Sequence, residues 1–487
     1  MINLCNPSLL RTQAFIDGKW CDADMHKTFA VKNPATGEVI AQVADLGIDE
    51  TRRAIKAAAQ AQHAWAQKTA KERSQLLRKW FDLVMQHQDD LAQILTLEQG
   101  KPLAEARGEI AYGASYIEWF SEEAKRIYGD VIAPPSADQR ILVLKQPVGV
   151  VAAITPWNFP CAMLARKMAP SLAAGCSIVA KPAAETPLSA LALAFLAHQA
   201  GIPAGVVNIV TGTDAAAIGA ELTGNPLVRK LSFTGSTAVG KQLIQQCAAD
   251  VKRITLELGG NAPFIVFDDA DLDEAVAGAI ASKFRNAGQT CVCANRFYIH
   301  RSVYAQFSEK LIAAMKLLLV GNGIDERVSV GPLISLAAVK KVQILVDDAI
   351  AKGAHIAYQA ELDVTKTAQG NFYPPTLLLN VAPDSALTRQ EIFGPVAALI
   401  PFDTDEEVVF WANNTEFGLA SYCYTRAAKR IKNLSDMLET GMLGINTGIV
   451  SNEMAPFGGI KQSGWGREGS HYGIEDYVSV KYLCEHF

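Results

Sequence analysis

The sequence predicts an α/β protein built on parallel β-sheets. Between Gly149 and Gly235, short apolar segments typical of buried strands alternate with helical segments, which is the pattern of a parallel sheet. A second alternation of this kind runs from Pro263 to about Pro401. Because the chain has 487 residues, more than one hydrophobic core usually supports, two or three domains are expected.

The region before the first alternation combines short strands with a long helical stretch. The expected elements are a β-hairpin with Asp-Gly at its turn, a second turn followed by a strand, a helical region, and a proline-rich segment followed by a strand. They are assigned, in that order, to residues 15–20, 33–43, 49–128 and 132–144. The strand at the end of this region, over 140–144, has little obvious local partner.

The two alternations contain the remaining predicted elements. In the first, strands are assigned to residues 150–154, 177–180, 206–210 and 230–233, and helices to 160–173 and 187–200. In the second, a helix is predicted over 271–286, with Asp271 as its cap, because Leu272, Val276, Ile280 and Phe284 recur every four residues.

The composition excludes several classes of function. A net charge of −5 offers no attraction for nucleic acid or an anionic membrane surface. No apolar run approaches the roughly 18 residues that cross a bilayer, and Met1 to Arg11 lack the pattern of a secretory signal. The nine cysteines are irregularly spaced, which favours free thiols in a reducing compartment, so we expect a cytoplasmic protein.

Three polar residues could form a catalytic site. Gly288 is expected to end the helix over 271–286, so that Cys291 is presented on a loop, although a free cysteine is more often a small buried residue. Glu257 lies 34 residues before Cys291, and Asn158 lies in the first alternation. A cysteine can attack a carbonyl, a carboxylate can activate water, and an amide can donate to an oxyanion.

With their flanking residues these segments resemble the aldehyde dehydrogenase superfamily. The matching motifs are Thr-Pro-Trp-Asn-Phe-Pro, Leu-Glu-Leu-Gly-Gly-Asn and Gly-Gln-Thr-Cys, and the likeness runs from about Phe15 to Tyr482. It implies two Rossmann-type parallel-sheet domains and a small β oligomerisation arm, in a homodimer or homotetramer. The implied division is a dinucleotide-binding domain at 1–128 and 147–258, a catalytic domain at 259–465, and the arm at 129–146 and 466–487.

The resemblance also implies a mechanism. Cys291 adds to an aldehyde, Asn158 and the Cys291 backbone N–H hold the oxyanion, hydride leaves for a nicotinamide, and water activated by Glu257 hydrolyses the thioester to a free acid. No metal, nucleic acid or membrane takes part. The sequence offers Arg285 and Arg296 as the nearest cations that could lower the pKa of Cys291.

The cofactor is expected at the carboxyl ends of the first set of strands. Phe233 to Gly240 follows a strand and could place Gly235 and Ser236 beside a phosphate, whereas Gly464 to Gly469 fits G-x-G-x-x-G but follows no predicted strand, so we do not expect it to bind pyrophosphate. By resemblance, the cofactor also contacts residues from three other segments. These are Trp157, Lys181, Ala184, Glu391 and Phe393.

The segment after Lys181 favours NADP. In NAD-preferring members a glutamate commonly stands three residues after this lysine, whereas here Ala184 holds that position and the acid comes one residue later, at Glu185. We therefore expect NADP as cofactor, with NAD also accepted. Without the resemblance, Lys181 would be interpreted as a surface lysine before a loop.

The substrate is expected to carry a second carboxylate. Arg166, Arg285 and Ser451 match positions that bind the distal carboxylate in succinate-semialdehyde dehydrogenases. Each residue also has an interpretation that involves no substrate. Arg285 could interact only with the C-terminal dipole of its helix, Arg166 could be exposed to solvent, and Ser451 could be part of a turn. Glutarate semialdehyde, or a broad range of aldehydes, is the alternative.

Cys293 is expected to be either a small buried residue or a redox partner of Cys291. The Cys-Val-Cys segment resembles succinate-semialdehyde dehydrogenases in which this loop acts as a redox switch.

Two further classes of protein stay open, a cofactor-free cysteine hydrolase and a non-catalytic structural protein on this fold. A cysteine hydrolase should have a histidine or another group that orients its base, and no histidine lies near a motif. The presence of Cys291, Glu257 and Asn158 together argues against a structural protein.

Overall fold

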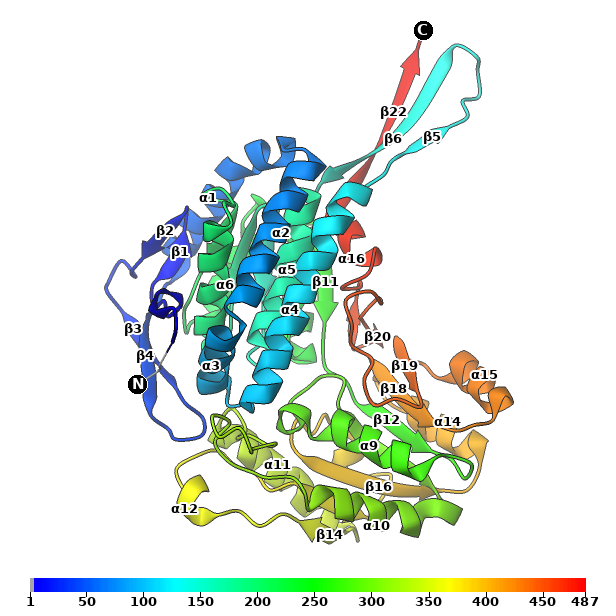
Figure 1. Ribbon diagram of the computed structural model, residues 1–487. Coiled ribbons are helices and arrows are strands. Elements are labelled where there is room, and N and C mark those ends of the chain that lie inside the picture. The colour runs from blue at the N-terminus through cyan, green and yellow to red at the C-terminus, as the bar shows by residue number, and fades with distance from the viewer. Residues whose placement is uncertain (1–3) are drawn as a thin grey trace.

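The computed structural model describes residues 4–487, with only the backbone described at Lys366, and it has the expected α/β architecture. Met1 to Asn3, the first residues of the segment expected to lack a secretory signal, lie outside the described residues. Two large sheets are each flanked by helices, and a thin β-arm extends from the body with the C-terminus at its tip (Figure 1). Within residues 4–487, no helix is long and apolar enough to cross a membrane.

The first sheet has eight strands in the order β2-β1-β9-β8-β7-β10-β11-β21. Its five central strands are parallel and three outer strands are antiparallel to their neighbours. The central strands are β7 (Val150–Ile154), β8 (Ile178–Lys181), β9 (Val207–Ile209), β10 (Val228–Thr234) and β11 (Arg253–Glu257), and the outer ones are β1 (Ala14–Ile16), β2 (Lys19–Cys21) and β21 (Gly464–Trp465). The four predicted strands of the first alternation are confirmed to within two residues at each end.

Helices cover both faces of this sheet. Alternate residues of β7 point to opposite faces, so that Val151 and Ala153 pack in a core with one set of helices and Val150 and Ala152 in a core with the other. The first set is α2 (Ala70–Gln86), α3 (Gln88–Gln99), α4 (Leu103–Glu123), α5 (Pro160–Ala174) and α6 (Pro187–Gln199); the second is α1 (Ile48–Gln67), α7 (Ala215–Gly224) and α8 (Thr237–Cys247). All residues of α5 are buried, because α2, α4 and α6 pack around it.

The second sheet has seven strands in the order β14-β15-β16-β13-β12-β18-β19, parallel except for β14. Its strands are β12 (Ala262–Val266), β13 (Ala294–His300), β14 (His355–Gln359), β15 (Thr376–Leu379), β16 (Val396–Phe402), β18 (Ala420–Tyr424) and β19 (Met442–Ile445). Its helices are α9 (Leu272–Lys283), α10 (Tyr304–Met315), α11 (Leu336–Ala351), α12 (Val364–Thr367), α13 (Ala386–Arg389), α14 (Asp405–Asn413) and α15 (Ala428–Met437).

The arm is a three-stranded antiparallel sheet in the order β22-β6-β5. Its strands are β5 (Asp130–Ile132), β6 (Gln139–Pro147) and β22 (Val478–His486), and α16 (Tyr472–Glu475) leads into it. The strand predicted without a local partner therefore has one, β5, which was missed because its three residues are all exposed and show no alternation. Two small sheets pair β3 (Thr28–Lys32) with β4 (Val39–Ala44) and β17 (Phe417–Gly418) with β20 (Ile460–Lys461).

The helix before the cysteine loop is shorter than predicted. Asp271 caps α9 as expected, but the helix ends at Lys283. Asn286 and Ala287 have φ angles of 52° and 54°, in the left-handed region, so the backbone leaves the helix before Gly288. This turn sets the position of the cysteine loop relative to α9.

Candidate active site

Cys291 lies on the loop before β13, and its side chain lines two cavities. Met163 lines both as well, so the cavities adjoin at these two residues. The larger has a volume of about 310 Å³, and the smaller has only about 10 Å³, close to the space of one water molecule.

The larger cavity contains most of the predicted cofactor residues. Trp157, Gly235, Ser236, Glu391 and Phe393 line it, together with Asn158. Trp157 and Phe393 face each other edge to face, with ring centres 5.5 Å apart, and Glu391 accepts from the Gly260 N–H at 3.3 Å. The turn before α8 therefore opens onto the same space as a pair of aromatic rings and a carboxylate.

Three predicted cofactor residues do not line this cavity. Gly240 serves packing, because a Cβ there would lie 2.6 Å from the side chain of Leu258. Lys181 ends β8 and is only 4% exposed, so the interpretation as a surface lysine is wrong. Burial lowers the pKa of Lys181, and its ammonium donates to the Pro182 carbonyl at 3.1 Å. Ala184 follows on the loop after β8.

The smaller cavity brings together all three predicted substrate residues. Arg166, Arg285 and Ser451 line it beside Cys291, although they come from α5, from the turn after α9 and from a loop near the C-terminus. The proposal that Arg166 serves only solvent is wrong, since it is 1% exposed on the buried helix α5. Tyr112, which the sequence did not suggest, also lines the cavity.

Arg166 is held by aromatic rings and by a carboxylate. Its guanidinium carbon lies 3.9 Å from the ring centre of Phe457, its Nη1 donates to the Tyr112 hydroxyl at 3.3 Å, and its Nε lies 2.9 Å from Glu468. Its Nη2 is buried without a hydrogen-bond partner among the described residues. Arg166 therefore keeps an unused donor at the smaller cavity.

The surroundings of Cys291 favour its protonated thiol. Burial raises its pKa to about 12; Glu391 and Glu257 act in the same direction, and Arg166 and Arg285 oppose them. Arg296, the other cation expected nearby, is instead committed to the backbone carbonyls of Asn261, Trp411 and Ala412. It lies in strand β13, which carries it away from the loop.

The Asn158 side chain lies beside the cysteine loop. Its Nδ2 donates to the Gln289 carbonyl at 3.1 Å, and the residue is 5% exposed. The backbone N–H of Cys291 donates to no other described residue. These two donors are the pair predicted to hold an oxyanion, and their residues line the same cavity.

Glu257 lines neither cavity, and its carboxylate is buried. Burial raises its pKa well above the usual range, the nearby Glu468 adds to this, and Arg166 and Lys167 oppose it. Its Oε2 has no hydrogen-bond partner in the described chain. Glu257 still lies near enough to Cys291 to raise the pKa of the thiol.

Glu468 was missed because its segment was set aside as an irrelevant glycine motif. Gly464 itself lies in a short strand, β21, and is paired with Glu257 of β11. Glu468 then accepts from Lys167 and pairs with Arg166. The sequence around Glu468 gives no sign of this cluster, because the partners of Glu468, Arg166 and Lys167, lie far away in the chain on α5.

Cys293 occupies surroundings different from those of Cys291. Its Sγ accepts from Lys283 Nζ at 3.3 Å, and it is 2% exposed and lines neither cavity. Both cysteines are free thiols.

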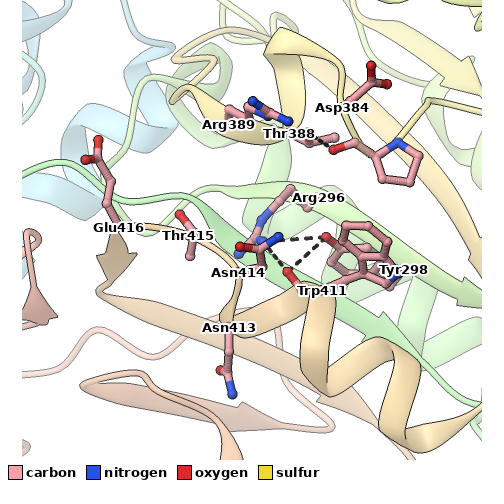
Figure 2. Close-up of a pocket in the computed structure, with 11 residues that line it drawn as sticks. Arg296, Tyr298, Asp384, Thr388, Arg389, Trp411, Asn413, Asn414, Thr415 and Glu416 are labelled. Atoms are coloured by element: carbon pink, nitrogen blue, oxygen red, sulfur yellow. Dashed lines mark hydrogen bonds between the residues drawn. The ribbon is translucent and has the colours of Figure 1, made fainter.

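A still larger cavity, of about 720 Å³, lies away from this chemistry (Figure 2). Arg296, Tyr298 and Trp411 are among the residues that line it, and the hydrogen bonds drawn in Figure 2 show that the buried guanidinium of Arg296 is already used. Neither a cysteine nor a histidine lines it. Its size alone therefore does not make it a reaction site.

The comparisons with known proteins agree with this geometry. A sequence model described as the aldehyde dehydrogenase family matches residues 20–483. A glutarate-semialdehyde dehydrogenase of Pseudomonas putida is 60% identical over 99% of both chains, and an NADP(+) succinate-semialdehyde dehydrogenase of Escherichia coli is 58% identical over 99% of both. A crystal structure of an NADP-dependent enzyme from E. coli has a TM-score of 0.98 at 58% identity and covers 100% of both chains.

Proposed function

The chain belongs to the aldehyde dehydrogenase family, and we propose that it oxidises succinate semialdehyde to succinate with NADP⁺. The observation that carries the choice of substrate is the smaller cavity, where the nucleophile candidate Cys291 meets Arg166, Arg285 and Ser451. Two guanidinium groups and a hydroxyl suit a small carboxylate. Because Arg166 is already paired with Glu468, Arg285 is the more available cation.

The cavity residues favour a negatively charged substrate, but they do not select its chain length. The names of the relatives include both glutarate- and succinate-semialdehyde dehydrogenase, at 60% and 58% identity. A cavity of about 10 Å³ must widen for either substrate. Glutarate semialdehyde, one methylene longer, is therefore the second candidate.

The larger cavity fits a nicotinamide dinucleotide. Gly235 and Ser236 at the N-terminus of α8 suit a phosphate, and Glu391 and the facing rings of Trp157 and Phe393 suit a ribose and a nicotinamide. With alanine at 184, no carboxylate stands at the position that favours NAD, and Lys181 can counter a 2′-phosphate. When bound, this cofactor supplies the hydride acceptor that makes the overall reaction an oxidation.

The side chains then have the following roles. The Cys291 sulfur, once deprotonated, forms a bond to the aldehyde carbon, and the carbonyl oxygen becomes an oxyanion held by Asn158 Nδ2 and the Cys291 N–H. After oxidation to the thioester, Glu257 takes a proton from the attacking water. The carbon–sulfur bond breaks, the sulfur regains a proton, and the free carboxylate leaves.

The test is a panel of matched aldehydes assayed with NADP⁺. Succinate semialdehyde and butanal differ by the distal carboxylate, as do glutarate semialdehyde and pentanal. Charge-assisted hydrogen bonds contribute about 1.5–3 kcal/mol, so kcat/KM for succinate semialdehyde should exceed that for butanal roughly tenfold to a hundredfold. Equal values for each pair would refute the carboxylate site, and a higher value for the longer semialdehyde would make glutarate the product.

We also propose a homo-oligomer assembled through the arm, and the same division into cofactor-binding, catalytic and arm segments that the sequence suggested. Apolar residues on the arm are exposed, including Val131 at 81%, Val480 at 67% and Tyr482 at 63%. Val480 and Tyr482 lie on one face of the arm sheet and Val131 lies on the other, and exposed apolar side chains that gather on a surface are typical of contact sites.

A further inference from the structure

A buried lysine that the mechanism does not use lies behind the candidate oxyanion donor. Lys101 stands between α3 and α4, with its side chain 0% exposed. Its Nζ donates to the backbone carbonyl of Asn158 at 2.8 Å and to Glu109 at 2.6 Å. An ammonium without exposure is costly unless it is paired and hydrogen-bonded, and here both conditions are met.

The partner carboxylate holds the segment on the other side of Asn158. Glu109 Oε1 accepts from the backbone N–H groups of Cys161 and Ala162, at 2.9 and 3.2 Å. These belong to the first turn of α5, whose N–H groups have no partner within the helix. The Lys101–Glu109 pair therefore binds the chain both at Asn158 and just after it.

A second donor completes the clamp from the cysteine loop. Asn286 Nδ2 donates to the Asn158 carbonyl at 2.9 Å and to the Gln289 carbonyl at 3.1 Å. The Asn158 side chain donates to the same Gln289 carbonyl, and Glu105 on α4 accepts from the Asn286 N–H at 2.8 Å. The Asn158 carbonyl is thus held between Lys101 and the turn that presents Cys291.

Lys101 itself is shielded from the substrate. It lines neither cavity, and the ring of Phe159, which does line the smaller one, lies 3.7 Å from Lys101 Nζ and 5.4 Å from the Arg285 guanidinium. Phe159 therefore stands between Lys101 and the smaller cavity, and the contact of Lys101 with the candidate oxyanion site is its hydrogen bond to Asn158.

We propose that Lys101, through its ion pair with Glu109, is a positioning residue that holds Asn158 in place as the oxyanion donor. The inference rests on the role proposed for Asn158 above. Fixed donors are effective because they need no reorganisation when the negative charge develops. Loosening the clamp should therefore slow addition to the aldehyde more than it weakens binding.

The experiment compares Lys101→Met/Glu109→Gln in the wild-type and Asn158→Ala backgrounds. Changing both partners avoids leaving a buried carboxylate unpaired. In the wild-type background, the rate of the acylation burst with succinate semialdehyde should fall about tenfold to a hundredfold. This fall should not exceed the roughly 10²–10³ rate loss expected when an oxyanion donor is removed outright. The KM for aldehyde and the Kd for NADP⁺ should change little. In the Asn158→Ala background, the same double change should have almost no further effect.

Lys252→Met/Asp250→Asn is the matched control, because Lys252 is also a buried lysine that binds two backbone carbonyls and a carboxylate. It should leave the burst rate unchanged. If the Lys101–Glu109 variant does not fold, Lys101→Arg carries the test in both backgrounds, since it keeps the charge but alters the reach to Asn158.

The outcomes separate the two proposals. An equal loss in both backgrounds, or no loss in the wild-type background, would overturn the positioning role alone. If Asn158→Ala by itself leaves the burst rate unchanged, the oxyanion role of Asn158 fails, and the inference fails with it.

Discussion

Burial acts in the same direction on the nucleophile and on the base. It raises the pKa of the Cys291 thiol to about 12 and that of the Glu257 carboxyl well above its usual range. In both groups burial therefore favours the protonated form. Arg166 and Arg285 are the cations that oppose this for Cys291, so a substrate that enters between them and the thiol also changes its electrostatic surroundings.

The rate of thioester hydrolysis should rise with pH over a range above the ordinary titration range of a carboxyl, because the pKa of Glu257 is raised. A carboxyl whose pKa is raised becomes a base only as the pH passes that value. Because Glu468 raises the pKa of Glu257, Glu468→Gln should move the rise to lower pH. The decay of the acyl-enzyme after a single turnover measures this. Glu123→Gln, which removes a carboxylate paired with Arg126, should leave the profile in place, and an unmoved profile in Glu468→Gln would disprove the coupling.

Arg285→Ala should impair the charged substrate selectively. The KM for succinate semialdehyde should rise roughly tenfold to a hundredfold, for a lost contact of about 1.5–3 kcal/mol, while that for butanal should hardly change. Steady-state assays with both aldehydes give the two values, and Arg285→Lys, which keeps the charge, is the control. Equal effects on both aldehydes would make Arg285 a structural residue.

Ala184→Glu should shift the cofactor preference from NADP⁺ toward NAD⁺. A carboxylate beside the 2′-phosphate would cost on the order of 1–4 kcal/mol at a partly exposed site, so KM for NADP⁺ should rise at least about fivefold. The uncharged Ala184→Gln controls for size. A wild type that already prefers NAD⁺ strongly would contradict the interpretation of Ala184.

At the scale of elements, the turn after α9 decides what the cysteine loop can do. The left-handed residues Asn286 and Ala287 direct Cys291 to the cavities, while Cys293 stays bound to Lys283 of the helix. A disulfide between the two cysteines therefore requires the loop to break the Lys283–Cys293 contact. The redox switch remains a prediction that depends on this motion.

Peroxide should inactivate the enzyme, and dithiothreitol should restore it. Oxidation converts Cys291 to a sulfenic acid, and attack by the Cys293 thiol then forms a disulfide and releases water. Cys293→Ala should keep its activity but lose it irreversibly under peroxide. Cys423→Ala, which removes another buried free cysteine, should behave as the wild type. Full recovery of the Cys293→Ala variant would show that Cys293 is not the resolving thiol.

For the whole molecule, charges on the arm should weaken assembly without unfolding the subunit. The double variant Val131→Asp/Val480→Asp places carboxylates at positions that are 81% and 67% exposed in the single subunit. The free subunit should tolerate these carboxylates, whereas an apolar contact between two subunits should be weakened by them. Light scattering should give a smaller mass than for the wild type. Val251→Asp, at a residue 90% exposed on the body, is the control. An unchanged mass would place the contact elsewhere.

Local patterns were enough to predict much of the fold. The strand over 150–154 and the start of the helix at Pro160 agree with β7 and α5, because apolar alternation and a first-turn proline act over a few neighbouring residues. The early end of α9 was not predictable in this way. Left-handed Asn286 and Ala287 are held by contacts such as that of the Asn286 N–H with Glu105, which belongs to a distant helix.

The sequence by itself determined the α/β class, the candidate nucleophile, base and oxyanion donor, and the three side chains at the smaller cavity. Only the tertiary structure decided their surroundings: the pairing of Arg166 with Glu468, the raised pKa of Glu257, the separate environment of Cys293, and the clamp of Lys101 on Asn158. The physical reason is that motifs record the residue types that a reaction needs. Burial and charge at a buried site instead come from side chains far apart in the chain, which only folding brings within a few ångströms of one another.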